Sequence, residues 1–129
     1  MSIVGIGVDV AEVARVQAAI ERPKTGARFL ARVFTEGEQA YCDGRGRGRF
    51  QSYAARFAAK EATMKALGRG WGATLRWLDI EVVRPSGERP TIVLAGLAAG
   101  YAATLGVRAI HLALTHTADI AVAEVIAEN

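Results

Sequence analysis

The chain has 129 residues and a net charge of +3, and hydrophobic residues make up 51% of it. This length favours one domain with one core, expected over residues 1–129, and no run reaches the roughly 18 consecutive apolar residues of a membrane span. The N-terminus lacks a basic leader and the one cysteine, Cys42, has no partner for an internal disulfide, so we expect a cytoplasmic protein without a secretory signal.

Residues 3–9 alternate between two faces and predict a β-strand. One face is apolar, and the other carries only Gly5, Gly7 and Asp9. We expect the two glycines to leave room for a bulky group to approach Asp9.

Asp9 has two interpretations. A helix is predicted over 10–20, and Asp9 followed by Glu12 fits a capping box at its start. Alternatively, Asp9 binds Mg²⁺ together with a second carboxylate, because this ion takes oxygen ligands and commonly only one or two carboxylates from the protein. The local sequence around Asp9 does not decide between the helix cap and the Mg²⁺ ligand.

Further helical signals follow in the first half of the chain. Residues 29–33 fit a helical turn, and Thr35 with Glu38 repeats the capping signature before a short helix through Tyr41. The glycine–arginine segment 43–49 is expected to be a mobile loop.

A long helix is predicted over 51–67, ending at Gly68. Alanines recur at every fourth position and form a narrow packing face: Ala54, Ala58, Ala62 and Ala66. Arg56 and Lys60 are expected on the outer side of this helix.

Glu61 and Lys65 lie at the edge of the alanine face. On a solvated surface they would form an i,i+4 ion pair worth about 0.3 kcal/mol. At the edge of a packing face each charge loses part of its solvent, so a metal on Glu61 and a phosphate on Lys65 are the alternative explanation. The segment GRGWG that follows fits a helix C-cap and turn, or a phosphate-binding turn.

The second half of the chain alternates short strands with one helix. We expect a hairpin of strands 79–85 and 91–95, a helix over 96–105, and a closing pair of strands at 111–115 and 120–126. These elements predict an α+β fold in which a small, mostly antiparallel sheet packs on the long helix. Such a sheet leaves apolar faces uncovered, so we expect an oligomer.

Two other features have ordinary and functional interpretations. His116 lies at the end of a predicted strand, where it is either a turn residue or part of a site. Basic residues crowd the first third of the chain and the loop with Arg45, Arg47 and Arg49, which favours an anionic partner. An RNA-binding module without catalysis and a Mg²⁺-dependent phosphohydrolase are therefore alternatives, although only Phe50 and Tyr53 offer aromatic rings near that loop.

Five segments together resemble the holo-[acyl-carrier-protein] synthase family of 4′-phosphopantetheinyl transferases. They are GIGVDVAEVARV, RVFTEGE, RFAAKEATMKALGRG, DIEVVRPSGERPTIVLAG and HLALTHTADIAVAEVI, in family order and over nearly the whole chain. The resemblance implies a homotrimer with active sites at the subunit interfaces. It also implies Mg²⁺-dependent transfer of the 4′-phosphopantetheine arm of coenzyme A to a serine of apo-acyl carrier protein, a step of fatty acid biosynthesis, with adenosine 3′,5′-bisphosphate as the leaving group.

The resemblance also assigns catalytic residues. It makes Asp9 and Glu61 the metal carboxylates and Lys65 the lysine that contacts the phosphates. Gly68 and Gly70 are expected to bind coenzyme A together with Lys65. The base that deprotonates the serine is left open between Glu61 and a water molecule.

Four more positions follow from the same resemblance. His116, with Thr117, is expected near the coenzyme A phosphates bound by a neighbouring subunit. Arg15 and Arg28 are expected to contact the acidic carrier protein. Neither nucleic acid nor a membrane is expected as a partner.

Overall fold

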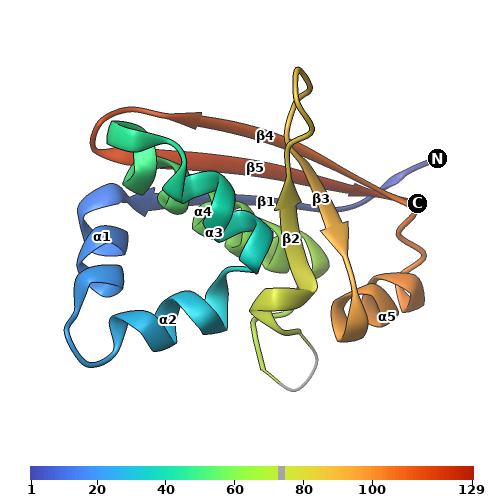
Figure 1. The fold of residues 1–129 in the computed structure, drawn as a ribbon. Helices are drawn as coiled ribbons and strands as arrows, with labels where there is room; N and C mark the ends of the chain where they lie inside the picture. The colour runs from blue at the N-terminus through green and yellow to red at the C-terminus, as the bar shows by residue number, and fades with distance from the viewer. Residues whose placement is uncertain (73–74) are drawn as a thin grey trace.

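The structure is a computed structural model that describes residues 1–72 and 75–129 (Figure 1). Its helices are α1 (Val13–Glu21), α2 (Gly26–Val33), α3 (Glu36–Asp43), α4 (Arg49–Leu67) and α5 (Gly96–Thr104), with 3-10 turns η1 (Gly46–Gly48) and η2 (Trp77–Asp79). Its strands are β1 (Ile3–Glu12), β2 (Ile80–Val83), β3 (Thr91–Leu94), β4 (Ala109–His116) and β5 (Ile120–Glu128).

The strands form two antiparallel sheets. A three-stranded sheet has the order β1-β5-β4, and β2 pairs only with β3. In Figure 1 the larger sheet runs along the top of the view, α1 and α2 lie at the left, and the β2–β3 hairpin lies with α5 at the right. This arrangement confirms the predicted α+β fold and both predicted strand pairs.

Helix α4 packs on one face of the three-stranded sheet with small side chains on both sides of the contact. The alanines of its packing face are buried, as are four residues of β5 that face them: Ala121, Ala123, Val125 and Ala127. A Cβ on Gly5 would overlap the carbonyl oxygen of Ala66, and one on Gly7 would overlap that of Ala62. The prediction that these glycines make room for a ligand is therefore wrong, because the backbone of α4 occupies that space.

Strand β1 is longer than the sequence pattern indicated. It runs to Glu12 because residues 10–12 continue the hydrogen-bonded ladder with β5. The predicted helix over 10–20 therefore starts too early. The capping box of Asp9 with Glu12 is also wrong, since Asp9 lies within the strand opposite Ala123 and Glu12 makes no side-chain cap.

The local signals elsewhere are confirmed. Thr35 Oγ1 accepts a hydrogen bond from the Glu38 backbone N–H, and the Glu38 carboxylate accepts one from the Thr35 N–H, which completes a capping box. Gly68 ends α4 in the left-handed region at φ 78°. The expected loop over 43–49 is, by contrast, mostly helical: Asp43 ends α3, η1 covers Gly46–Gly48 and Arg49 begins α4. An ion pair of 2.8 Å between Arg49 Nε and Asp43 Oδ1 joins the two ends of this segment.

The expectation that Arg56 and Lys60 lie on the outer side of α4 is wrong. Both are buried, because α3 and β2 cover that side of the helix. The Lys60 ammonium lies 2.8 Å from Glu38 Oε1 and also donates to the carbonyls of Trp77 and Ile80. Burial lowers the pKa of Lys60, and the charge of Glu38 opposes that shift. This pair joins α3, α4 and β2 in the interior.

The other face of the three-stranded sheet is uncovered and exposes apolar side chains on β1. On β1 it exposes Ile6, Val8 and Val10, which are 57%, 49% and 56% accessible. Their ladder partners on β5 are Ile126, Glu124 and Val122, so one exposed carboxylate lies among these apolar side chains. No described helix is both long and apolar enough to cross a membrane.

Candidate functional site

Asp9 and Lys65 meet where β1 passes under the second half of α4. Lys65 Nζ donates hydrogen bonds to Asp9 Oδ1 at 2.9 Å and to the Val8 carbonyl at 3.1 Å. The Asp9 side chain is only 11% exposed, whereas the Lys65 side chain is 54% exposed. The aspartate is therefore held by the sheet and helix, and the lysine reaches it from solvent.

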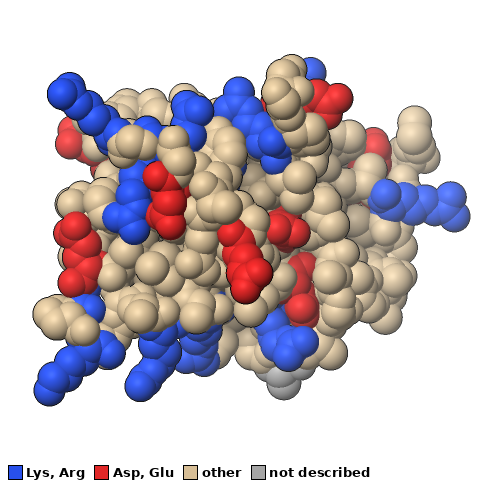
Figure 2. Space-filling model, in the orientation of Figure 1, with Lys and Arg blue, Asp and Glu red and all other residues tan. Residues whose placement is uncertain are grey.

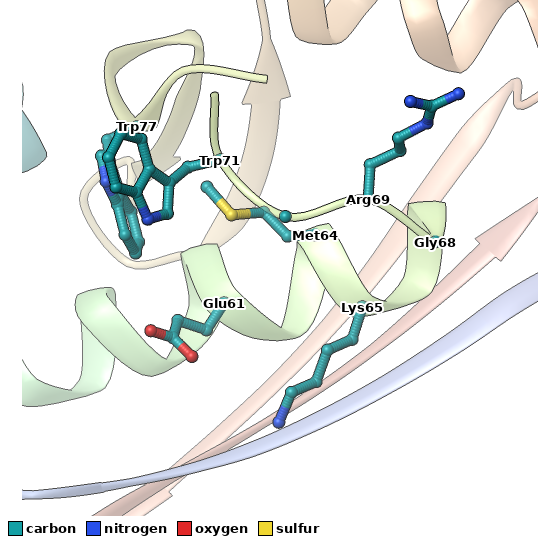
Figure 3. Close-up of a pocket in the computed structure, with 8 residues that line it drawn as sticks. Glu61, Met64, Lys65, Gly68, Arg69, Trp71 and Trp77 are labelled. Atoms are coloured by element: carbon teal, nitrogen blue, oxygen red, sulfur yellow. The ribbon is translucent and has the colours of Figure 1, made fainter. Parts of the chain in front are cut away.

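Glu61 lies one helical turn before Lys65 and faces the same strand (Figure 3). Burial, and then the negative charge of Asp9, raise the pKa of Glu61, while Lys65 opposes the shift. The hydrogen bond to Asp9 in turn raises the pKa of Lys65. The structure thus brings Asp9, Glu61 and Lys65 together, as the sequence predicted.

The two neighbouring carboxylates, Asp9 and Glu61, suit a divalent cation. Within residues 1–72 and 75–129, no group of three or more His, Cys, Asp or Glu side chains is placed to hold a metal. Mg²⁺ does not need such a group, since it commonly takes one or two carboxylates and completes its shell with water and substrate phosphates. Asp9 and Glu61 fit that pattern, because both reach an open pocket.

Glu61 lies at the junction of two pockets. Pocket A has a volume of about 320 Å³ and is lined by Glu61, Met64, Lys65, Gly68, Arg69, Gly70, Trp71 and Trp77 (Figure 3). Pocket B has a volume of about 340 Å³, and its lining includes Asp9, Glu61, Arg15, Phe29 and Phe57. Glu61 is therefore accessible from two sides, whereas Asp9 is reached from pocket B.

Gly68 and Gly70 line pocket A beside Lys65, as predicted. Gly68 has a structural reason as well, because its left-handed conformation ends α4. Apart from its chain neighbours, no described residue has an atom within 4 Å of a Cβ built on Gly70. Arg69, between them, points away from Glu61 and Lys65 in Figure 3, and its Nε lies 3.3 Å from the Tyr101 hydroxyl.

His116 does not join the carboxylates within one chain. It ends β4, is exposed, and lines pocket C, a third pocket of about 370 Å³. Residues of α4 in pocket C, such as Arg56, lie on the opposite flank of the helix from Glu61. Thr117 orders the turn after β4, where its hydroxyl accepts from the backbone N–H groups of residues 119 and 120.

Pocket C is strongly basic, which the sequence analysis missed. Besides His116 it is lined by four arginines: Arg45, Arg56, Arg84 and Arg89. The Arg56 guanidinium lies 4.0 Å from the centre of the Tyr41 ring, and its buried Nε has no hydrogen-bond partner in the described part of the chain. These arginines come from three separate segments, so only the tertiary structure reveals the cluster.

Arg15 and Arg28 lie on the surface near pocket B. Arg15 lines the pocket, and its side chain is 82% exposed, with only a long ion pair of 3.9 Å to Glu12. Arg28 is exposed on α2, next to Phe29 of the pocket lining. Figure 2 shows basic side chains gathered along the edge formed by α1 and α2, at the lower left of the view.

Comparison with known proteins gives a consistent result. Residues 5–123 match the model of the 4′-phosphopantetheinyl transferase superfamily. A holo-[acyl-carrier-protein] synthase of Anaeromyxobacter sp. (strain K) is 56% identical over 128 residues, which cover 98% of this chain and 97% of the relative. The synthase of Streptomyces coelicolor is 50% identical over 129 residues, which cover 100% of both chains.

Solved structures show the same fold. A holo-(acyl-carrier-protein) synthase of Bacillus anthracis in complex with CoA (3′,5′-ADP) has a TM-score of 0.79 and 33% identity, over 98% of this chain and 97% of that one. The synthase of Helicobacter pylori in complex with coenzyme A has a TM-score of 0.82 and 28% identity, over 95% and 99% of the two chains.

Proposed function

Because this chain belongs to the 4′-phosphopantetheinyl transferase superfamily, we propose that its Asp9, Glu61 and Lys65 form the centre of a holo-[acyl-carrier-protein] synthase site. The reaction moves the 4′-phosphopantetheine arm of coenzyme A to a serine hydroxyl of apo-acyl carrier protein. Adenosine 3′,5′-bisphosphate leaves. The proposal treats residues 1–129 as one catalytic domain that acts in the cytoplasm.

Asp9 and Glu61 are the proposed ligands of Mg²⁺, which when bound neutralises the charge of the diphosphate. Support comes from the raised pKa of Glu61, caused by burial and by Asp9, because two carboxylates forced together favour a bound cation. Lys65 supplies the next positive charge beside them. In phosphoryl transfer of this kind, the protein mainly positions groups and neutralises charge.

The two pockets suggest where each substrate lies. Coenzyme A is proposed to approach through pocket A, which Lys65, Gly68 and Gly70 line together with Glu61. The carrier serine is proposed to enter through pocket B, which carries Arg15 at its rim. Glu61 borders both pockets, so it and a water molecule are the two candidates for the base that accepts the serine proton.

A homotrimer with shared sites is part of the proposal. The exposed apolar side chains of β1 on the outer face of the three-stranded sheet favour burial against another surface, and a second copy of the chain is the proposed one. Pocket C lies on the opposite flank of α4 from Glu61, so His116 and Thr117 serve a coenzyme A molecule bound to a neighbouring chain. Its arginines suit the phosphates of that nucleotide.

The juxtaposition of Asp9, Glu61 and Lys65 at the junction of pockets A and B carries the proposal. It is tested by incubating apo-acyl carrier protein with coenzyme A, Mg²⁺ and this protein, followed by mass spectrometry of the carrier. A gain of the phosphopantetheine mass is expected. Hydrolysis of coenzyme A without modification of the carrier would instead indicate a phosphohydrolase.

No structural observation favours an RNA-binding module. Arg49 of the glycine–arginine loop is engaged by Asp43 and lies over the rings of Phe50 and Tyr53. The aromatic rings near the loop are therefore already covered by the chain's own arginine.

A further inference from the structure

Lys65 is bound to the carboxylate that the proposed metal needs. Its ammonium lies 2.9 Å from Asp9 Oδ1, and its second partner is the Val8 carbonyl on the same strand. Glu61, four residues earlier on the same helix, forms no ion pair with Lys65. Lys65 therefore pairs with residues of β1 and not with Glu61 at the i,i+4 position.

This contact between Lys65 and Asp9 opposes the binding of a divalent cation to Asp9. A cation on Asp9 must share a carboxylate that already receives the charge and hydrogen bond of an ammonium group. Lys65 is also free to leave, since its side chain is 54% exposed and ends a flexible four-carbon stem. It lines pocket A as well, where the proposed donor brings two phosphate groups.

We propose that Lys65 couples metal binding to donor binding by exchanging Asp9 for the diphosphate of the donor. Without donor, the ammonium occupies Asp9 and lowers the affinity for Mg²⁺. When a diphosphate enters pocket A, Lys65 moves to it and releases the carboxylate. By linkage, the donor then raises the affinity for Mg²⁺ and Mg²⁺ raises the affinity for the donor by the same factor. This inference rests on the proposed function, because it needs a metal at Asp9 and Glu61.

The test measures Mg²⁺ affinity by titration calorimetry, with and without saturating coenzyme A and with no carrier protein present. Lys65→Met should bind Mg²⁺ about three- to tenfold more tightly than the wild type in the absence of coenzyme A, because an exposed ion pair is worth up to about 1 kcal/mol and a repulsive charge is also removed. The gain in Mg²⁺ affinity caused by coenzyme A should be smaller in Lys65→Met than in the wild type. A merely structural role of Lys65 could only weaken binding of the metal.

Arg69→Met is the matched control. Arg69 also lines pocket A, but its guanidinium reaches Tyr101 and not Asp9. It should change the Mg²⁺ affinity of the donor-free protein less than twofold. An equal gain in Arg69→Met would show a general charge effect and overturn the exchange, as would an unchanged or weaker Mg²⁺ affinity in Lys65→Met.

If the proposed function itself is wrong, the Mg²⁺ titrations give a different result. If Asp9→Asn binds Mg²⁺ as tightly as the wild type, with and without coenzyme A, the metal does not lie on Asp9. The same holds if neither the wild type nor Lys65→Met binds Mg²⁺ when coenzyme A is present. Either outcome would overturn the metal pair as well as the exchange.

Discussion

Gly7 and Ala62 bring strand β1 and helix α4 into backbone contact. A Cβ on Gly7 would overlap the Ala62 carbonyl oxygen, so only glycine permits this approach. Asp9 follows two residues later on the same face of β1, and Glu61 immediately precedes Ala62 on α4. The close packing of two small residues therefore sets the separation of the two carboxylates.

We expect Gly7→Ala to destabilise the protein by about 1–3 kcal/mol or more, because the helix must move away from the sheet. Urea denaturation followed by circular dichroism measures the free energy of unfolding. Gly100→Ala is the control, since it lies inside α5 and, outside that helix's own backbone, no described residue has an atom within 4 Å of a Cβ at this position. That change should stabilise slightly, and a Gly7→Ala variant as stable as the control would contradict the backbone contact.

Asp9→Asn and Glu61→Gln should each lower the rate of carrier modification by roughly 100-fold or more while leaving the fold intact. Each change removes one negative oxygen ligand from the proposed metal pair and keeps the size of the side chain. The rate is measured by mass spectrometry of the carrier at limiting Mg²⁺. Glu21→Gln, an exposed carboxylate on α1, is the control. A folded variant with a turnover near that of the wild type would contradict the assignment of Asp9 and Glu61 as metal ligands.

The pH dependence of the rate should reflect Glu61. Its pKa is raised by burial and by Asp9, so the folded protein protonates Glu61 at a higher pH than an ordinary glutamate. Since the proposed metal needs the ionised form, the rate should fall as the pH drops through this raised pKa. Mg²⁺ binds the ionised form, so more Mg²⁺ should move the acid limb to lower pH. If the fall in rate at low pH does not shift with the Mg²⁺ concentration, a group other than Glu61 causes it.

The sequence predicted those features that depend on neighbouring residues. The capping box of Thr35 with Glu38 and the glycine that ends α4 are complete within a few positions, and both are confirmed. The position of Glu61 at the edge of the alanine face also follows from helical periodicity alone. These signals were enough to place one carboxylate of the site.

Features set by distant segments could not be predicted. Residues 10–12 carry signals for helix and strand, and only the ladder with β5 decides for strand. Lys60 resembles a surface lysine until Glu38, 22 positions earlier in the sequence, pairs with it inside the protein. The arginines of pocket C are likewise scattered along the chain. Their chemistry is visible in the sequence, but their proximity is not.

His116→Ala should weaken coenzyme A binding at a site on a neighbouring chain. Mixing His116→Ala subunits with Glu61→Gln subunits should then restore part of the activity, because about a quarter of the interfaces in an equal random mixture contain neither change. Rates are compared before and after the subunits are exchanged, and light scattering reports whether about three chains form each particle. An active monomer, or a mixture no faster than the mean of its parents, would rule out shared sites.

Arg15 and Arg28 are the positions at which docking of the carrier is tested. Acyl carrier proteins are acidic, and both arginines are exposed beside pocket B. The ordinary explanation is that they only keep the surface charged. If they dock the carrier, Arg15→Glu and Arg28→Glu should each raise the KM for the carrier roughly tenfold, because reversal replaces attraction by repulsion, with a smaller effect on the affinity for coenzyme A.

Salt separates docking from a general loss of activity. The penalty of each reversal should shrink as ionic strength rises, since exposed charges are screened beyond about 10 Å at 0.1 M. Arg108→Glu is the control, because that residue is exposed just before β4 and lines a separate pocket together with residues of β3 and α5, not pocket B. If both reversals leave the carrier KM unchanged at low salt, the carrier docks elsewhere. The loop with Arg45 and Arg47 would then be the next surface to change, since both arginines are exposed and Arg45 lines pocket C.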